Sequence, residues 1–199
     1  MPREGKARVL TEDEFKRLLV IAKNAQMAER NLAIIYCSFG LGLRAKEIAA
    51  LKVSDVFDNG FKILEEVNLT RSMTKGDKQR HVYINNKKII TALTCHIKVM
   101  KEMEGLCFRY DGALFKTQRK VAFTPDTLQK WFRKLYDKAG IKGASSHSGR
   151  RTFITRLIEQ GADIKAVSHI AGHASITTTA GYVATNPDRL KRISSLAVF

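Results

Sequence analysis

Apolar positions along the chain recur mainly with the period of amphipathic helices. Between residues 11 and 25, one stripe of apolar side chains comprises Phe15, Leu18, Leu19 and Ala22. Residues three or four positions apart share one face of a helix, so this stripe marks a face that packs against a core. Thr11 and Glu14 have the spacing of a capping box, and we therefore predict that a helix begins at this threonine.

Further segments show helical spacing, N-terminal caps or glycine stops. Their predicted ranges are 32–39, 44–51, 89–100, 124–140, 148–161, 163–170, 175–182 and 187–197. The clearest start is Thr124-Pro125, because threonine caps a helix and proline suits its first turn. The pattern therefore predicts a mainly helical protein.

The apolar period shortens to two after residue 52. Residues 53–57 and 61–69 flank Asp58-Asn59-Gly60, and Asn-Gly accepts the positive φ of a tight hairpin turn. Residues 81–84 alternate polar and apolar side chains and predict a third strand.

The sequence contains no internal repeat and no low-complexity linker. We therefore predict one mainly α domain with a small three-stranded antiparallel β-sheet, an α+β fold, over residues 11–199. Residues 1–10 are expected to form a basic N-terminal arm that could be flexible.

The net charge of the chain predicts a function that the helical pattern alone does not, which is binding of a polyanion. Lysine and arginine number 35 against 19 aspartates and glutamates, giving a formal net charge of +16. Such an excess attracts nucleic acid first and an acidic membrane surface second. No apolar run approaches the roughly 20 residues of a bilayer span, and the N-terminus lacks an apolar signal core. We expect a cytoplasmic protein without a membrane partner.

Metal sites are not expected. Cys37, Cys95 and Cys107 include no CxxC pair, which suits reduced thiols better than a zinc cluster or a disulfide framework. His169 and His173 have helical spacing, but Ile170 stands where a zinc protease places its glutamate. No nucleotide-binding motif is present either, so we predict no cofactor.

Two basic stretches stand where neither helix propensity nor core packing explains them. In GLGLRAKEI, residues 40–48, Arg44 follows a glycine turn at a predicted helix start, with Glu47 one turn on. A cation there opposes the helix dipole, so it is either solvated or serves a bound anion. In SMTKGDKQRHVYI, residues 72–84, the basic side chains are Lys75, Lys78 and Arg80. Basic hairpin tips are commonly solvated, and they also reach into DNA grooves.

Two further stretches place nucleophilic or basic groups near one another. HSGRRTF, residues 147–153, sets His147 and Arg150 around a helix start, a combination that can hold a phosphate and move a proton beside it. GHASITTTAGYV, residues 172–183, places His173 nine residues before Tyr182 in a segment too polar for a core.

Taken in this order, the four stretches resemble the tyrosine recombinases, also called the phage integrase family. The family signature is an arginine in Gly-Leu-Arg-x-x-Glu, a lysine on a β-hairpin, His-x-x-Arg, Gly-His, and a tyrosine nine residues after that histidine. The matching catalytic positions are Arg44, Lys75, His147, Arg150, His173 and Tyr182. The resemblance covers nearly the whole chain and implies the catalytic-domain fold of that family, in a bacterial or phage-encoded protein.

The resemblance implies a site-specific recombinase or integrase that cleaves and rejoins double-stranded DNA through a 3′-phosphotyrosyl intermediate, without metal or ATP. Tyr182 attacks the phosphate, and the covalent intermediate conserves the bond energy for resealing. Arg44 and Arg150 grip the non-bridging oxygens as planar guanidiniums. A tyrosine hydroxyl is protonated at neutral pH, and His147 is the better candidate for the base that accepts its proton.

The remaining roles also follow from the resemblance. Lys75 protonates the leaving 5′-oxygen, with Lys78 as the fallback if the hairpin register differs, and His173 hydrogen-bonds the phosphate. Glu47 supports Arg44 from the second shell. The predicted further DNA contacts are Lys78, Arg80 and Arg151. The family also implies a homotetramer on DNA, formed by exchange of the last helix.

The sequence departs from the family in two places. Gly149 stands where a bulky apolar residue usually precedes the second arginine, and we expect it to loosen the seating of Arg150. About ten residues precede the predicted catalytic domain, where most members carry a core-binding domain. The chain is therefore either similar to the short fimbrial-type invertases or a fragment.

Two other functions stay open at this point. A type IB topoisomerase uses the same tyrosine chemistry but reseals its own strand, and a catalytically silent DNA-binding regulator would keep only the fold.

Overall fold

The computed structural model describes residues 7–74, 79–182 and 194. These residues belong to two compact units, Met1–Phe153 and Ile154–Phe199. Only residue 194 of the predicted last helix, 187–197, is described, and the first six residues of the predicted arm lie outside the described residues.

The first unit holds most of the helices. Their bounds are α1 Glu12–Lys23, α2 Ala28–Gly40, α3 Ala45–Ala50, α4 Val53–Val56, α5 Lys87–Glu104, the 3-10 turn η1 Gly105–Cys107, and α6 Pro125–Lys138. Helix α7, Ser148–Glu159, begins in this unit and ends in the second one. The second unit continues with α8, Ile164–Ala171, and α9, Ile176–Ala180.

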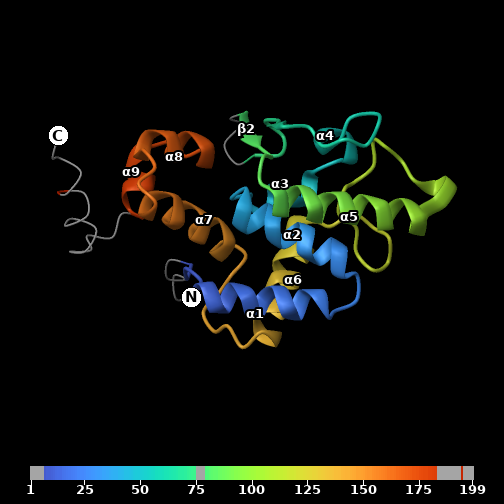
Figure 1. Cartoon of the computed structure of the whole chain (residues 1–199), viewed down its shortest axis with the longest axis horizontal. Coiled ribbons are helices and arrows are strands. Elements are labelled where there is room, and N and C mark those ends of the chain that lie inside the picture. The colour runs from blue at the N-terminus through green and yellow to red at the C-terminus, as the bar shows by residue number, and fades with distance from the viewer. Residues whose placement is uncertain (1–6, 75–78, 183–193, 195–199) are drawn as a thin grey trace. The chain divides into compact units, whose positions relative to one another are not determined.

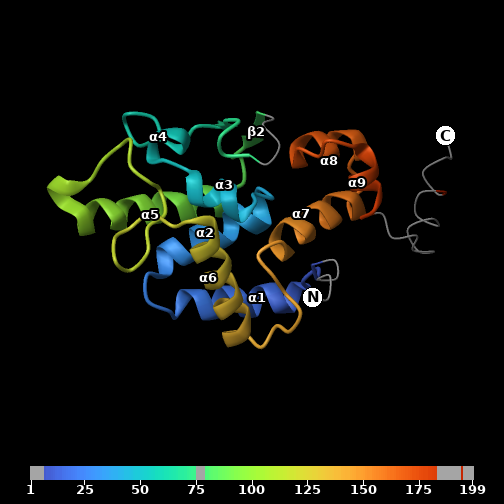
Figure 2. The ribbon, with the colours of Figure 1, turned by 180° about the vertical axis from the view of Figure 1, so that it is seen from behind.

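Helix α2 is the centre of the first unit. It packs against α1 on one side and α5 on the other, and α6 runs across α1 (Figures 1 and 2). The core is apolar, with Leu18, Ile34 and Phe132 fully buried. The chain just before α1 is tied to the start of α7, because the backbone N–H of Leu10 donates to Thr152 Oγ1 at 3.0 Å.

The capping residues read from the sequence begin the helices as predicted. Thr11 Oγ1 accepts from the backbone N–H of Glu14, whose carboxylate accepts from the backbone N–H of Thr11 in return. Thr124 caps α6 in the same way, with Pro125 in the first turn. These predictions are confirmed.

The sheet is smaller than predicted. Among the described residues it has two antiparallel strands, β1 Glu66–Leu69 and β2 Arg80–Tyr83, rather than three. Val67 pairs with Val82, and both side chains are buried. Mainly helical structure with a small antiparallel sheet is confirmed, and the strand predicted at 81–84 is present as β2. The strand predicted over residues 53–57 is wrong.

The missing strand is the segment 53–57, of which Val53–Val56 form helix α4 instead. Asp55 accepts from the backbone N–H of Lys52 at 2.8 Å, and the N–H groups of Val53 and Ser54 donate to the carbonyls of Gly112 and Tyr110. These contacts satisfy the first-turn donors of a helix, which a helix cannot satisfy itself. The chain still reverses at Asp58-Asn59-Gly60, where Phe57 and Ile63 form an isolated antiparallel bridge and the Asp58 carboxylate accepts from two backbone N–H groups. The positive φ of 61° falls on Phe61.

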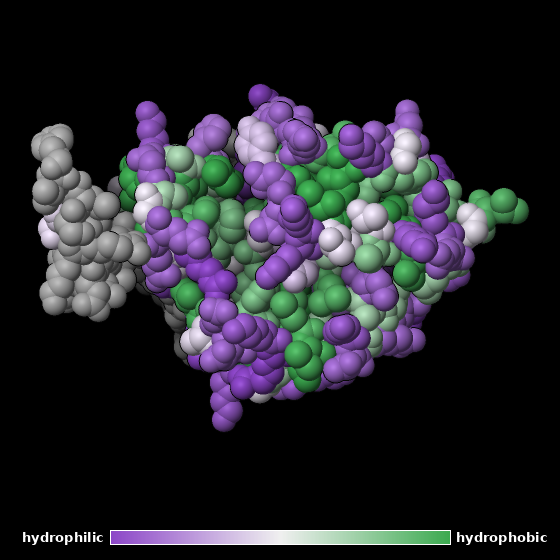
Figure 3. All heavy atoms as spheres, in the orientation of Figure 1, coloured by the Kyte–Doolittle hydropathy of each residue, from purple (hydrophilic) through white to green (hydrophobic). Residues whose placement is uncertain are grey.

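The surface mixes polar and apolar side chains. On the face shown in Figure 3, hydrophilic groups cover most of the area and apolar patches lie between them. Among the described residues, no helix combines the length and the apolar composition that a bilayer span requires.

Candidate active site

Arg44 stands at the N-cap of α3, where the backbone is extended and the helix has just begun. Its backbone N–H donates to Glu47 Oε2 at 2.7 Å, and its Nη1 donates to Glu47 Oε1 at 2.9 Å. The Glu47 side chain is fully buried, whereas that of Arg44 keeps 21% exposure. The carboxylate therefore fixes both the backbone and the guanidinium of Arg44.

Arg150 is anchored on the loop that leads to Arg44. Its Nη1 donates to the carbonyl oxygen of Gly42 at 2.8 Å, and the residue is 5% exposed. Gly42 has φ +63°, a conformation that favours glycine, and a Cβ there would lie 2.4 Å from the ring of Phe153. The structure thus places the two predicted phosphate-binding arginines against one short loop.

Glu47 also forms an ion pair with a second arginine. Arg80, at the start of β2, donates Nη2 to Glu47 Oε2 at 2.6 Å and is 6% exposed. Burial raises the pKa of the Glu47 carboxyl, but the charges and hydrogen bonds of Arg80 and Arg44 outweigh burial and hold that pKa below its ordinary value. We predicted Arg80 as a surface residue that contacts DNA. The structure instead buries its side chain against Glu47.

His147 directly precedes α7 and is exposed. Its backbone N–H donates to Ser145 Oγ at 3.3 Å, and its carbonyl accepts from the N–H of Arg151 at 2.9 Å. It borders a hollow of about 240 Å³ that Lys130 and Arg133 of α6 also line. The candidate base therefore opens onto a recess in which Lys130 and Arg133 stand beside one carboxylate, that of Asp126. Arg151 is half-buried, and its role as a DNA contact stays a prediction.

Gly149 sits where the helices α2 and α7 touch. A Cβ at this position would lie 2.1 Å from Ser38 Oγ and 2.9 Å from Phe39 Cδ2. The expected looseness around Arg150 is therefore wrong, because the glycine allows a close approach of the two helices that a bulky residue would block. No feature of the sequence indicated Ser38 as the residue that Gly149 contacts.

Lys75 and Lys78 lie outside the described residues. Thr74, the last residue described before them, accepts from Lys46 Nζ through its carbonyl oxygen at 3.1 Å. The assignments of the two lysines stay predictions.

In the second unit, His173 and Tyr182 lie side by side. Gly172 ends α8 with φ +63°, and the backbone N–H of His173 donates to the carbonyl of Ser168. The two aromatic rings stack with centroids 5.9 Å apart and planes 16° apart. The sequence placed the two residues on either side of a short helix, and α9 is that helix.

Thr179 was missed by the sequence reasoning. It is fully buried, and its Oγ1 lies 2.7 Å from His173 Nδ1, within hydrogen-bond distance. This contact fixes the ring orientation of His173. The triple threonine of α9 was a signal, since three consecutive threonines in a short helix supply hydroxyls that form polar contacts when they are buried.

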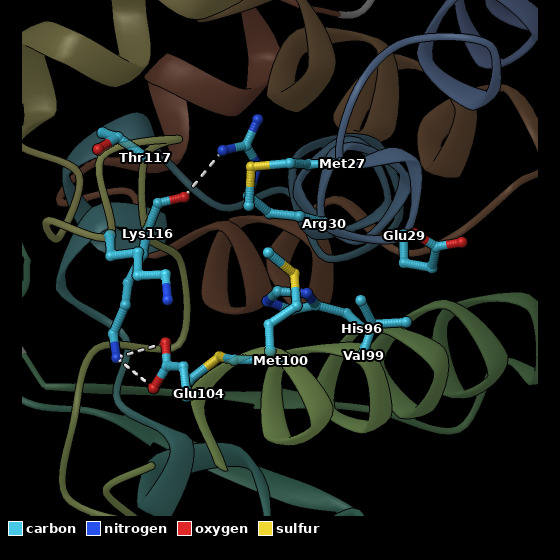
Figure 4. A pocket seen from close by; sticks show the side chains of 11 residues that line it. Met27, Glu29, Arg30, His96, Val99, Met100, Glu104, Lys116 and Thr117 are labelled. Carbon is cyan, nitrogen blue, oxygen red and sulfur yellow. Dashed lines mark hydrogen bonds and ion pairs between the residues drawn. The ribbon is translucent and has the colours of Figure 1, made fainter. Parts of the chain in front are cut away.

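A separate small pocket of the first unit contains none of the predicted catalytic residues (Figure 4). Its volume is about 40 Å³, enough for a few water-sized molecules. Lys116 Nζ donates to both oxygens of Glu104, and Arg30 Nη1 donates to the carbonyl oxygen of Lys116 at 2.9 Å. Burial lowers the pKa of Arg30 to about 10. These contacts hold α2, α5 and the following loop together.

Comparison with known proteins covers most of the chain. Residues 8–189 match the model of the phage integrase family. The tyrosine recombinase XerD of Oceanobacillus iheyensis is 32% identical over 187 residues, which cover 92% of this chain and 59% of the relative. The chain thus spans about three fifths of the length of that curated relative.

Solved structures agree with this match. A crystal structure of XerA recombinase has a TM-score of 0.72 at 28% identity and covers 96% of this chain and 66% of that one. The Tn1549 transposon integrase, in complex with transposon right end DNA, has a TM-score of 0.77 at 21% identity and covers 99% of this chain and 68% of that one. At 21% identity, the similarity to the transposon integrase shows a shared fold.

Proposed function

The chain belongs to the phage integrase family, and we propose that it breaks and rejoins DNA strands as a site-specific recombinase. The chain spans 59% of the length of the XerD relative. The proposal therefore assigns to this chain the chemistry of strand transfer alone. The DNA complex of the transposon integrase supports duplex DNA as the substrate.

The observation that carries the proposal is the bracing of two guanidiniums around one loop. Glu47 accepts from the guanidinium of Arg44. The carbonyl oxygen of Gly42, two residues before Arg44, accepts from the guanidinium of Arg150. Preorganised donors aimed at a phosphate stabilise the charge that develops on its non-bridging oxygens, each by roughly 3–4 kcal/mol. Planar guanidiniums suit this task because they bind two oxygens at once.

The reaction begins when the hydroxyl oxygen of Tyr182 attacks the scissile phosphorus. A bond forms between that oxygen and phosphorus, the bond to the 5′-oxygen breaks, and His147 accepts the proton of the hydroxyl. Lys75 gives a proton to the leaving 5′-oxygen. A 5′-hydroxyl from another strand then attacks the phosphorus of the 3′-phosphotyrosyl group and gives its proton to Lys75. The bond from phosphorus to the Tyr182 oxygen breaks, and that oxygen takes its proton back from His147.

His173 positions the phosphate in this scheme. Thr179 fixes one ring nitrogen of His173, and the imidazole stacks on the ring of Tyr182. A histidine oriented in this way can direct its other nitrogen to a phosphate oxygen next to the nucleophile. Arg151 and Lys78 are assigned to neighbouring DNA phosphates.

We assign a homotetramer on DNA as the active assembly, with the last helix exchanged between subunits. Sedimentation of the protein on cleaved duplex DNA tests this assignment. Four subunits per paired complex are expected, and a chain that stays monomeric on its cleaved duplex contradicts it.

The activity itself is tested with nicked duplexes that carry candidate sites from the DNA flanking the gene. A nick beside the scissile phosphate lets the short downstream fragment diffuse away, so the covalent complex accumulates. Wild-type protein is expected to form a denaturation-resistant adduct, and Tyr182→Phe is expected to bind DNA without forming one. A folded wild-type protein that binds these duplexes but forms no adduct contradicts the proposal.

A further inference from the structure

Arg80 and Arg44 share one buried carboxylate. Glu47 Oε2 accepts from Arg80 Nη2 at 2.6 Å and from the backbone N–H of Arg44 at 2.7 Å, while Oε1 accepts from Arg44 Nη1 at 2.9 Å and lies 3.4 Å from Arg80 Nε. The guanidinium of Arg80 thus meets both oxygens of the carboxylate. This arrangement is the bidentate fork that makes arginine–carboxylate pairs directional.

The burial of the three side chains is unequal. Glu47 is 0% exposed and Arg80 is 6% exposed, whereas Arg44 keeps 21%. Arg80 therefore faces the interior of the unit, and Arg44 is the member of the cluster that opens outward. A carboxylate buried without a strong partner would take up a proton or pull water inward. Arg80 supplies the charge that keeps Glu47 ionised and in place.

We propose that Arg80 is a positioning residue that holds Glu47 so that Glu47 can hold the phosphate-binding Arg44. This proposal rests on the function proposed above and adds a residue from strand β2 to the site. Arg80 does not touch the reacting atoms in it. The helix α3 alone supplies Arg44 and Glu47, and the strand supplies the counter-charge that makes their contact rigid.

An alternative role for the same geometry is purely structural, with Arg80 fastening β2 to α3. The two roles differ in what they predict for DNA cleavage at saturating DNA. A structural fastener affects the melting temperature, whereas a positioning residue affects the cleavage rate of protein that is still folded and bound. The pH dependence of the rate separates them further.

The test compares Arg80→Met, Arg80→Lys and the control Arg109→Met on a nicked duplex. Arg109 also pairs with a carboxylate, that of Asp111, but it is 73% exposed. At saturating DNA, Arg80→Met is expected to slow adduct formation by about 10- to 100-fold, as loss of a supporting contact does. Arg80→Lys is expected to recover part of the rate, and Arg109→Met to leave it unchanged.

The pH dependence of the cleavage rate separates the two roles, because a purely structural role of Arg80 would leave it unchanged. Glu47 is faced by Arg80 and Arg44, so removal of Arg80 leaves burial as the main influence on its pKa and raises it. The cleavage rate of Arg80→Met is then expected to fall as the pH is lowered through a range where the wild-type rate changes little. Glu47→Gln/Arg80→Met is expected to lose this additional pH dependence and to cleave at about the rate that Arg80→Met reaches at low pH.

A second measurement does not depend on catalysis. In nitrogen-labelled protein, the side-chain N–H signal of Arg44, assigned by its loss in Arg44→Lys, is expected to be sharp in the wild type and broadened in Arg80→Met. If the wild type forms no adduct, the proposed recombinase function fails while this signal still decides the role of Arg80. A variant Arg80→Met that cleaves at the wild-type rate, or whose Arg44 signal is unchanged, overturns the proposal.

Discussion

Arg44 shows how an arginine assigned to the phosphate is held in place against local helix preference. A cation at a helix N-terminus is unfavourable, because the backbone dipole and the free N–H groups there attract negative charge. Glu47 resolves the conflict, since its carboxylate accepts from both the backbone N–H and the guanidinium of Arg44. One buried residue thus caps the helix and fixes the side chain assigned to the phosphate.

Gly149 is a second residue whose identity follows from packing. We predict that Gly149→Ala destabilises the protein by about 1–3 kcal/mol through overpacking, because its new Cβ meets Ser38 Oγ. The free energy of unfolding in urea measures the effect. The control is the same substitution in a Ser38→Gly background, where the loss is expected to be smaller. An equal loss in both backgrounds would show that contact with Ser38 is not the cause.

At the scale of elements, His96 joins α5 to the loop that follows η1. Its Nε2 lies 2.8 Å from the carbonyl oxygen of Leu114, and its ring stacks on Phe115. Burial lowers the pKa of His96 to about 4, with the nearby charge of Arg30 acting in the same direction and the hydrogen bond to Leu114 against it. His96 is therefore neutral in the folded protein at neutral pH.

This burial predicts a pH-dependent stability. Between pH 6.5 and about 4 the unfolded chain protonates His96 and the folded protein does not, so the free energy of unfolding falls as the pH is lowered. The loss across this window is roughly 3 kcal/mol. His96→Gln keeps a donor without titrating, and its stability relative to wild type is expected to rise as the pH drops. A difference that stays constant from pH 7 to 4 would contradict the prediction.

Elements with strong local signals were predictable from the sequence, and those decided by distant contacts were not. Thr11 and Thr124 each indicate the start of a helix, because the groups that form the cap lie within three residues of one another. Residues 53–57 were misread as a strand, since the acceptors that turn them into α4 come from residues 110–112. A period-two pattern this short does not separate the two structures.

The candidate site divides in the same way. The motif residues Arg44, Arg150 and His173 could be selected because their order and spacing resemble a family signature; chemistry alone left Arg44 either solvated or bound to an anion. Their supports, Arg80 and Thr179, could not, because each contact joins a side chain to another element through the fold. Arg80 in particular looks like a surface charge in a basic strand until its burial is known.

At the scale of the whole molecule, the net charge of +16 predicts DNA binding that weakens steeply with salt. Lys130 and Arg133 line the recess beside His147. Their joint replacement by alanine is expected to lower the slope of log Kd against log salt by about 2. Titration of a fluorescent duplex at several salt concentrations measures it.

The matched control is Lys16→Ala. Lys16 lies on α1, pairs with Glu12 and is 64% exposed. Its replacement is expected to leave the slope unchanged if DNA lies along the recess. Equal slopes for the control and for the double variant of Lys130 and Arg133 would place the DNA elsewhere on the protein.

The most direct test of the central claim is to identify the residue that becomes joined to DNA. Adduct formed on a nicked duplex is digested with protease and nuclease, and the modified peptide is sequenced by mass spectrometry. We predict a nucleotide joined through its 3′-phosphate to Tyr182, in the peptide that also contains Thr179. A nucleotide attached to any other residue, or through its 5′-phosphate, would contradict the assignment of Tyr182 as the nucleophile.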